Sequence, residues 1–335
     1  MVRNRSIRNF LFSNKPHRFI FVASILIIYG IFGKRNRVIE EQEQHIPVRG
    51  VITTLIRSNN HSVQLVINMI HSVFRFHSFH NYSYPIIIFH DQNLTTSMRE
   101  RILFCVLKSH KHVKISFESV DFQPPDLPAM TSRHDKPIGY RLMCRFWTYD
   151  VFYHPSIVQN GYDYLMRMDD DSYFSDKVPE DVFLYTHNNG LDYVYRATYT
   201  EPTPEMQPVF EKYVPNSRVS SNCVYNNFFV MRLKWFYESK RVQNFINDLI
   251  TDHLMLREYI GDGCVHTAML KIDEQVKSER MKSLPYGHNN HLMPSGRLNY
   301  FFQSTITFHK DVEDSCDYLV VIQGSGTLAR IDLSK

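Results

Sequence analysis

The hydrophobic pattern of the chain alternates between short β-branched runs and longer segments with helical spacing. The run at 51–56 (Val-Ile-Thr-Thr-Leu-Ile) predicts a first strand, because β-branched residues favour pleated, buried positions. Between 63 and 76, apolar residues recur every three or four positions, as on one face of a helix. The same reasoning predicts further strands at 86–89, 113–117, 162–168, 193–196 and 225–231, and further helices at 95–107, 139–152, 179–185, 242–259 and 264–270.

This alternation of strand and helix predicts an α/β fold with a mainly parallel sheet and helices on both of its faces. The segment 201–215 contains four prolines and is predicted to be mostly loop with one short helix. The pattern at 316–331 predicts a terminal hairpin that turns at Gly324-Ser-Gly. No internal repeat is found.

The amino-terminal region contains one uncharged apolar segment, 19–33, with basic residues on both sides. It is short for a membrane span, which typically takes about 17–25 residues. A cleaved signal peptide and a buried helix are the alternatives, but there is no clear cleavage pattern, and the flanking charges disfavour burial. The basic residues before it predict an uncleaved signal anchor with a cytosolic amino terminus. The expected organisation is a cytosolic tail at 1–18, a transmembrane helix at 19–33, a stem at 34–48 and a luminal domain at 49–335.

The charge balance separates this amino terminus from the rest of the chain. Eight of the 38 Lys and Arg residues precede residue 40, and none of the 34 Asp and Glu residues does. The remainder is therefore slightly acidic, which gives no support for nucleic-acid binding. The five cysteines form no Cys-x-x-Cys pair, so a zinc knuckle is not expected. Their odd number leaves at least one thiol unpaired or intermolecular, and their spacing leaves the pairing open.

The most informative stretch is 162–174, in which an apolar strand runs into Asp169, Asp170 and Asp171. Open α/β sheets bind ligands beyond the carboxyl ends of their strands. In an extended chain, Asp169 and Asp171 point to one side and Asp170 to the other. Two carboxylates at that position suit a hard divalent cation that binds phosphates. The alternative is a solvated acidic turn.

Several ordered blocks between 49 and 291 resemble glycosyltransferase family 15, the fungal-type Golgi α-1,2-mannosyltransferases. The most specific block is Tyr140-Arg-Leu-Met-Cys-Arg-Phe, which is similar to the family's Tyr-Arg-x-Met-Cys-Arg-Phe. The others are Thr53-Thr-Leu-Ile-Arg-Ser-Asn, Tyr162-Asp-Tyr-Leu-Met-Arg-Met-Asp, Cys223–Phe229, Gly261-Asp-Gly-Cys-Val-His-Thr and Gly287-His288. The resemblance implies a GT-A fold, a type II Golgi membrane topology, Mn²⁺ as cofactor, GDP-mannose as donor and a glycan or glycoprotein as acceptor.

The resemblance also implies roles for particular residues. Arg57, Tyr140 and Arg167 would face the donor, where Arg offers a forked pair of N–H groups to phosphate. Asp169 would bind the metal together with His288, and Asp171 joins them from the acidic strand end. Asp262 would lie near the acceptor hydroxyl.

Each of these residues also has an ordinary structural interpretation. Arg167 would pair with a neighbouring Asp, Tyr140 would belong to the core, His288 to a loop, and Asp262 would cap a helix.

Two departures from the family pattern bear on the chemistry. The family's Glu-Pro is Asp-Asp here, and Phe229 takes the place of a family Glu considered as nucleophile or base. A double displacement through that Glu is therefore not expected in this chain. The rival functions are a GT-A enzyme that uses a UDP-sugar and an inactive luminal protein that binds glycans.

Overall fold

The computed structural model describes residues 48–77, 84–126, 136–293, 302–304, 308, 312 and 316–334. The predicted tail and signal anchor, and the predicted stem up to residue 47, lie outside these residues. Within them, no helix has both the length and the hydropathy that a membrane crossing requires.

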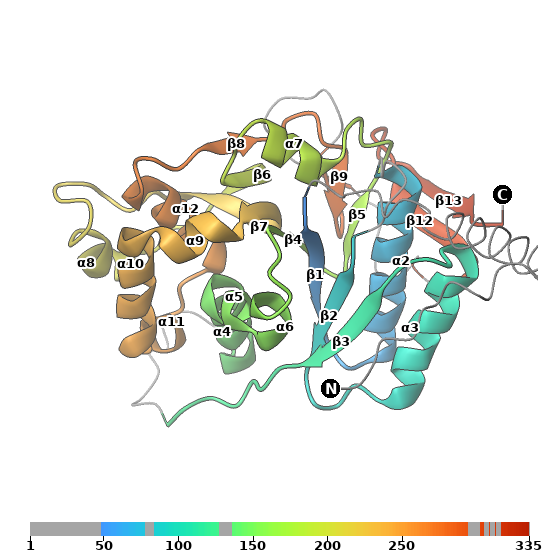
Figure 1. Cartoon of the computed structure of the whole chain (residues 1–335), viewed down its shortest axis with the longest axis horizontal. Coiled ribbons are helices and arrows are strands. Elements are labelled where there is room, and N and C mark those ends of the chain that lie inside the picture. Colours follow the sequence, from blue (N-terminus) through green and yellow to red (C-terminus); the bar gives the residue numbers. More distant parts are fainter. Residues whose placement is uncertain are drawn as a thin grey trace, which may run out of the picture. The chain divides into compact units, whose positions relative to one another are not determined.

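The centre of the domain is a seven-stranded sheet in the order β3-β2-β1-β4-β7-β6-β8 (Figure 1). Parallel pairing joins β1 to β2 and β4, and β2 to β3, whereas β7 runs antiparallel to both of its neighbours. The predicted mainly parallel sheet is therefore confirmed. Its strands are β1 (Gly50–Ile56), β2 (Ile86–His90), β3 (Ile115–Ser119), β4 (Tyr164–Met168), β6 (Tyr193–Thr200), β7 (Asn222–Arg232) and β8 (Ser278–Arg280).

Helices flank this sheet on both sides, as predicted (Figure 1). On one side lie α2 (Asn60–Phe76) and α3 (Thr96–Ser109). The other side carries α4 (Ile138–Arg145), α5 (Val151–Tyr153), α6 (Pro155–Val158), α9 (Leu233–Glu238), α10 (Lys240–Thr251), α11 (Leu254–Arg257) and α12 (Asp262–Ile272). Two further helices, α7 (Val182–Asn188) and α8 (Gln207–Phe210), follow β5 and β6 in the chain.

Two predicted helices differ in detail from the structure. The helix predicted at 242–259 is divided into α10 and α11, because His253 takes a left-handed backbone conformation with φ of 52°. The helix predicted at 139–152 contains a π-helical turn, Phe146–Asp150, between α4 and α5. Pro155 does not only end a helix but also begins α6, since its fixed φ suits the first helical position.

A second, smaller sheet was not predicted. Its order is β11-β10-β9-β5, and it consists of β5 (Ser172–Phe174), β9 (Tyr286–His288), β10 (His291–Met293) and β11 (Phe302–Gln303). Strands of two or three residues are too short to show a hydrophobic period. This sheet matters for function because β5 begins three residues after Asp169 and pairs Ser172 with His288.

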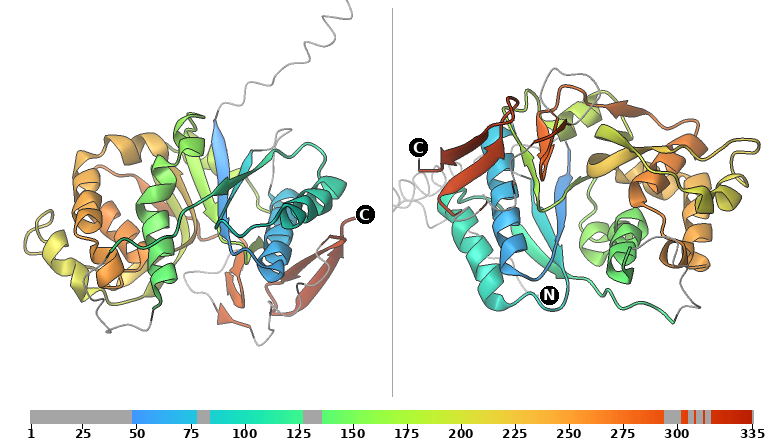
Figure 2. Two further views of the ribbon diagram at one scale, coloured as in Figure 1. Left: turned by 90° about the horizontal axis from the view of Figure 1, so that it is seen from below. Right: turned by 180° about the vertical axis from the view of Figure 1, so that it is seen from behind.

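The predicted terminal hairpin is present as β12 (Tyr318–Ile322) and β13 (Leu328–Asp332). It lies beside α2 (Figure 2), where the Asn68 side chain donates to Val320 O (2.8 Å) and accepts from Val320 N (2.7 Å). Disulfides join Cys105 to Cys316 and Cys223 to Cys264, while Cys144 is a buried free thiol.

Candidate functional site

A cavity of about 990 Å³ lies beyond the carboxyl ends of the parallel strands β1 and β4. Arg57 follows β1, and Asp169 follows β4, so both strands deliver side chains to it. The first turn of α2, the amino-terminal part of β7 and the start of α12 complete its wall. This is the position at which open α/β sheets bind ligands.

The structure brings Asp169, Asp171 and His288 together in this cavity. Each offers one ligand atom, and these atoms all lie within 4.8 Å of one another. His288 Nε2 is 2.9 Å from Asp171 Oδ1 and 3.7 Å from Asp169 Oδ2. Two carboxylate oxygens and one imidazole nitrogen form a donor set that suits Mn²⁺, so the residues present fit a divalent cation.

The two carboxylates meet for a different reason from the one expected. The chain does not continue as an extended strand after Met168 but turns, with Ser172 N donating to Asp169 O (3.0 Å). Asp171 O then accepts from Asn289 N (2.9 Å), which ties the turn to the residue after His288. The local turn and the β5–β9 pairing together place the three ligand atoms.

Asp170 points toward the start of α2, where it is hydrogen-bonded to Ser62. Burial, and then the charge of Asp171, raise the pKa of the Asp170 carboxyl to about 7. Asp170 is therefore not among the residues whose ligand atoms converge.

Arg167 lies between two of the predicted site residues. It is 2 % exposed, its Nε donates to Asp169 Oδ1 (2.7 Å), and its Nη1 donates to Asp262 Oδ2 (2.6 Å). Its guanidinium lies 4.3 Å from the ring centroid of Trp147. Burial disfavours the positive charge of the guanidinium and lowers its pKa. The carboxylates of Asp169 and Asp262 outweigh this effect of burial, so the pKa of Arg167 is raised above its usual value. Arg167 also lines the cavity, so its expected contact with the donor stays a prediction beside its hydrogen bonds to the two carboxylates.

Asp262 is the first residue of α12 and is nearly buried in the cavity wall. The glycines on either side explain the Gly-Asp-Gly sequence. A Cβ at Gly263 would lie 2.3 Å from Val224 O of β7, and one at Gly261 would lie 2.3 Å from Glu201 Oε2. Both glycines therefore allow the start of α12 to pack directly on its neighbours.

Tyr140 and Arg57 both line the cavity. The Tyr140 ring packs against Tyr259 with a centroid separation of 5.8 Å, and Lys136 Nζ lies 4.8 Å above the Tyr140 ring. Burial is the largest cause of the raised pKa of Tyr140, so its phenol stays protonated at neutral pH. Arg57 is exposed at the end of β1 and remains available to an anionic ligand.

The sequence did not single out Glu201, Asn227 and Tyr225, which also line the cavity. Glu201 accepts hydrogen bonds from Tyr199 Oη (2.8 Å) and Tyr259 Oη (2.9 Å). Asn227 Nδ2 donates to Asp169 Oδ2, and Tyr225 Oη lies 2.7 Å from His288 Nδ1. The one available signal was the polar pair at 226–227 within an otherwise apolar strand.

Phe229, which stands where the family that the sequence resembles has a Glu, does not line the cavity. It is fully buried, with its ring 5.4 Å from that of Tyr193 and 5.0 Å from that of His266.

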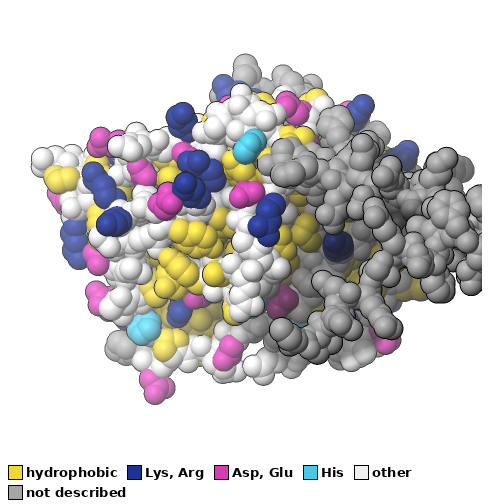
Figure 3. Space-filling model, viewed as in Figure 1, with side chains coloured by type: hydrophobic (Ala, Val, Ile, Leu, Met, Phe, Trp, Pro, Cys, Tyr) yellow, Lys and Arg dark blue, Asp and Glu magenta, His cyan; other side chains and the backbone are white. Residues whose placement is uncertain are grey.

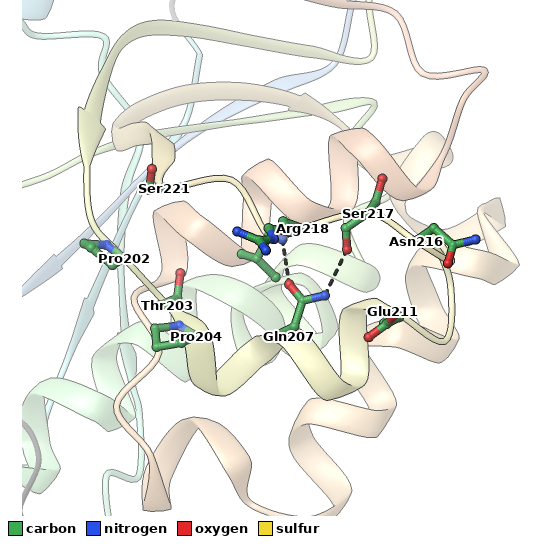
Figure 4. A pocket seen from close by; sticks show the side chains of 10 residues that line it. Pro202, Thr203, Pro204, Gln207, Glu211, Asn216, Ser217, Arg218 and Ser221 are labelled. Carbon is green, nitrogen blue, oxygen red and sulfur yellow. Dashed lines mark hydrogen bonds between the residues drawn. The ribbon is translucent and has the colours of Figure 1, made fainter.

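A second pocket, of about 580 Å³, is lined by residues between Pro202 and Ser221 (Figure 4). Gln207 braces it by donating to Ser217 O (2.9 Å) and accepting from Val219 N (2.9 Å). Among the described residues, the only group of three metal-ligating side chains is that of Asp169, Asp171 and His288, so the candidate active site is the larger cavity.

On the face of the molecule seen in Figure 3, Lys and Arg side chains lie among Asp and Glu side chains.

No protein-family model and no curated protein matches the sequence. Among solved structures, core-mannan synthase A (CmsA/Ktr4) from Aspergillus fumigatus, in a Mn/GDP form, matches with a TM-score of 0.64 and 17% identity, over 80% of this chain and 83% of that chain. The mannosyltransferase Ktr4p from S. cerevisiae matches with a TM-score of 0.60 and 17% identity, over 78% of this chain and 76% of that chain. A structure of Ktr4p in complex with GDP matches with a TM-score of 0.57. At these identities the likeness shows the fold, which confirms the predicted GT-A architecture.

Proposed function

We propose that the protein is a metal-dependent glycosyltransferase that transfers mannose from GDP-mannose to a hydroxyl group of a glycan or glycoprotein. The observation that carries the proposal is the convergence of Asp169, Asp171 and His288 within 4.8 Å, in the wall of the 990 Å³ cavity. The proposal is supported by the shared fold with core-mannan synthase A in its Mn/GDP form and with Ktr4p in its GDP complex.

In the proposed reaction, different residues of the cavity have different roles toward the cation and the donor. Asp169, Asp171 and His288 would hold Mn²⁺, which neutralises the diphosphate of the donor. Arg57 lines the same cavity and supplies forked N–H donors to phosphate oxygens. Arg167 holds Asp169 and Asp262 in fixed orientations through hydrogen bonds to each. These charges are in place before the donor binds, as electrostatic preorganisation requires.

Asp262 is the residue that we assign to the acceptor. One of its oxygens accepts from Arg167 Nη1, and the residue lines the cavity. We assign Asp262 to orienting the acceptor hydroxyl and accepting its hydrogen bond. Because Phe229 is apolar and buried, that position contributes no nucleophile.

The proposed location is the Golgi membrane, with a single type II span at 19–33 and the catalytic domain in the lumen. The uncharged segment with its basic flanks supports this topology. The two disulfides support an oxidising compartment, in which such bonds persist.

The test uses the full-length protein in detergent micelles with GDP-mannose or UDP-sugars, with and without Mn²⁺, and measures release of the nucleotide and labelling of a mannoside acceptor. We expect turnover with GDP-mannose only when Mn²⁺ is present. Asp169→Ala should lower turnover about 100-fold or more, because a preorganised charge at the reacting phosphate is lost. Asp176→Ala, an exposed carboxylate outside the cavity, is the matched control. Turnover by Asp169→Ala equal to that of the wild type would exclude the proposed metal role. Turnover with a UDP-sugar but not with GDP-mannose would show that the donor is a UDP-sugar.

A further inference from the structure

The two ring nitrogens of His288 have different neighbours. Nε2 faces the carboxylates, at 2.9 Å from Asp171 Oδ1 and 3.7 Å from Asp169 Oδ2, and it also lies 2.9 Å from Asn227 Nδ2. Nδ1 faces the opposite way and lies 2.7 Å from Tyr225 Oη. Nε2 is therefore the nitrogen on the side of the two other candidate metal ligands, and the phenol of Tyr225 lies at the other nitrogen.

A nitrogen that binds a cation must present a lone pair, so the ring proton has to reside on the other nitrogen. In His288 that other nitrogen is Nδ1, and the Tyr225 oxygen is placed to accept its N–H. This hydrogen bond is compatible with a proton on Nε2 as well as with a bare Nε2. Tyr225 therefore holds the ring in one orientation both before and after a cation binds.

Tyr225 is itself well fixed. It lies in β7, where it pairs with Ala197 of β6. Its ring meets the His288 ring edge-on, with centroids 5.5 Å apart, and meets the Tyr199 ring at 5.8 Å.

We propose that Tyr225 is a positioning residue for the metal site: its phenol oxygen accepts the Nδ1 proton of His288, fixes the ring and its tautomer, and thereby strengthens cation binding. The inference rests on the proposed metal-dependent function and adds to it a residue outside the ligand set. Partners that orient a ligating histidine typically contribute about 10–100-fold to metal affinity.

The test measures Mn²⁺ affinity directly, by the electron paramagnetic resonance signal of free Mn²⁺ in titrations of the full-length protein in micelles, with and without GDP. Tyr225→Phe keeps the ring and removes only the hydroxyl. We expect its Mn²⁺ dissociation constant to rise about 10–100-fold. Tyr185→Phe is the matched control, because the Tyr185 phenol donates to Glu279 (2.7 Å) outside the cavity. Its dissociation constant should stay within about twofold of the wild-type value, since the orienting partner of the ligand is intact.

A second measurement separates positioning from general damage to the fold. If Tyr225 acts through the cation, saturating Mn²⁺ restores the sugar-transfer rate of Tyr225→Phe toward the wild-type rate, and the Mn²⁺ concentration for half-maximal rate increases. A rate that stays low at saturating Mn²⁺, or an unchanged dissociation constant, would overturn the inference while leaving the proposed function intact. Absence of Mn²⁺ binding by the wild-type protein in the presence of GDP would instead refute the proposed function.

Discussion

Replacing Arg167 with Met tests whether the buried guanidinium holds the site together. Arg167 is 2 % exposed, and it donates to Asp169 at 2.7 Å and to Asp262 at 2.6 Å. Met has a similar length and an apolar body, so the substitution mainly removes the charge and its hydrogen bonds. The two carboxylates would then remain in the cavity wall without their shared cation.

The expected loss follows from the burial of the three groups. Removing one partner of a buried ion pair costs about 3–5 kcal/mol, because the remaining charge is left uncompensated. The Asp169 and Asp262 side chains are 18 % and 9 % exposed, so water partly solvates them and the lower end of that range applies. The lost cation–π contact with Trp147 adds about 1 kcal/mol. We therefore expect the free energy of unfolding to fall by about 4 kcal/mol, and Tm by about 7 °C for a domain of this size.

The assay is thermal unfolding of the full-length protein, followed by circular dichroism. Lys212→Met is the control, because Lys212 pairs with Asp248 at 3.2 Å on the surface, where loss of a pair costs at most about 1 kcal/mol. Adding Asp262→Asn to Arg167→Met should recover part of the loss, since it removes one uncompensated carboxylate. A Tm for Arg167→Met that matches the Lys212→Met value would refute the reasoning.

Two further predictions concern stability. Burial lowers the pKa of His77 to about 3, and its Nε2 accepts from Val182 N (3.2 Å). The His77 ring therefore stays neutral in the folded protein below pH 6.5, whereas in the unfolded chain it binds a proton there. As the pH is lowered from 7 to 5, the free energy of unfolding should fall by about 2 kcal/mol for this reason. His77→Gln should remove that share of the pH dependence of the free energy of unfolding, measured by denaturant titrations at several pH values. If the free energy of unfolding of His77→Gln changed with pH as much as that of the wild type, the assignment to His77 would be wrong. The Cys223–Cys264 disulfide closes a loop with a sequence separation of 41 residues. Its replacement by two serines should cost about 4 kcal/mol, as measured by Tm, through the greater freedom of the unfolded chain; a loss below about 1 kcal/mol would show that the bond adds little.

The parts of the fold that could be predicted are those with a strong local pattern. The β-branched run of β1, the amphipathic face of α2 and the alternation that follows were sufficient for the parallel half of the sheet. The hydrogen bond from Arg167 to Asp169 could also be predicted from the local sequence, because residues two apart along an extended chain point to the same side. The second carboxylate on Arg167 comes from Asp262, 95 residues away, and no local pattern places it.

The parts that could not be predicted depend on contacts between distant strands. His288 is the last residue of a three-residue strand, and only the family resemblance singled it out. Asn227 and Tyr225 belong to the site because β7 pairs with β4, and at the end of that pairing Asp169 N donates to Asn227 O (3.2 Å). Glu201 lies next to a proline-rich loop, whose composition predicts only irregular structure.

The burial of Phe229 narrows the chemistry that the cavity supports. Six carboxylates line it: Asp91, Asp169, Asp170, Asp171, Glu201 and Asp262. Asp169 and Asp171 converge on the metal position, and Asp170 is turned to Ser62 at the start of α2. This leaves Asp91, Asp262 and Glu201 as the carboxylates that can contact the sugar or the acceptor. Each already accepts hydrogen bonds, Asp91 from Ser58 and Asn93, Asp262 from Arg167 and Glu201 from two phenols. In the proposed reaction, such carboxylates would stabilise positive charge at the sugar, while the buried Phe229 gives β7 no nucleophile at that position.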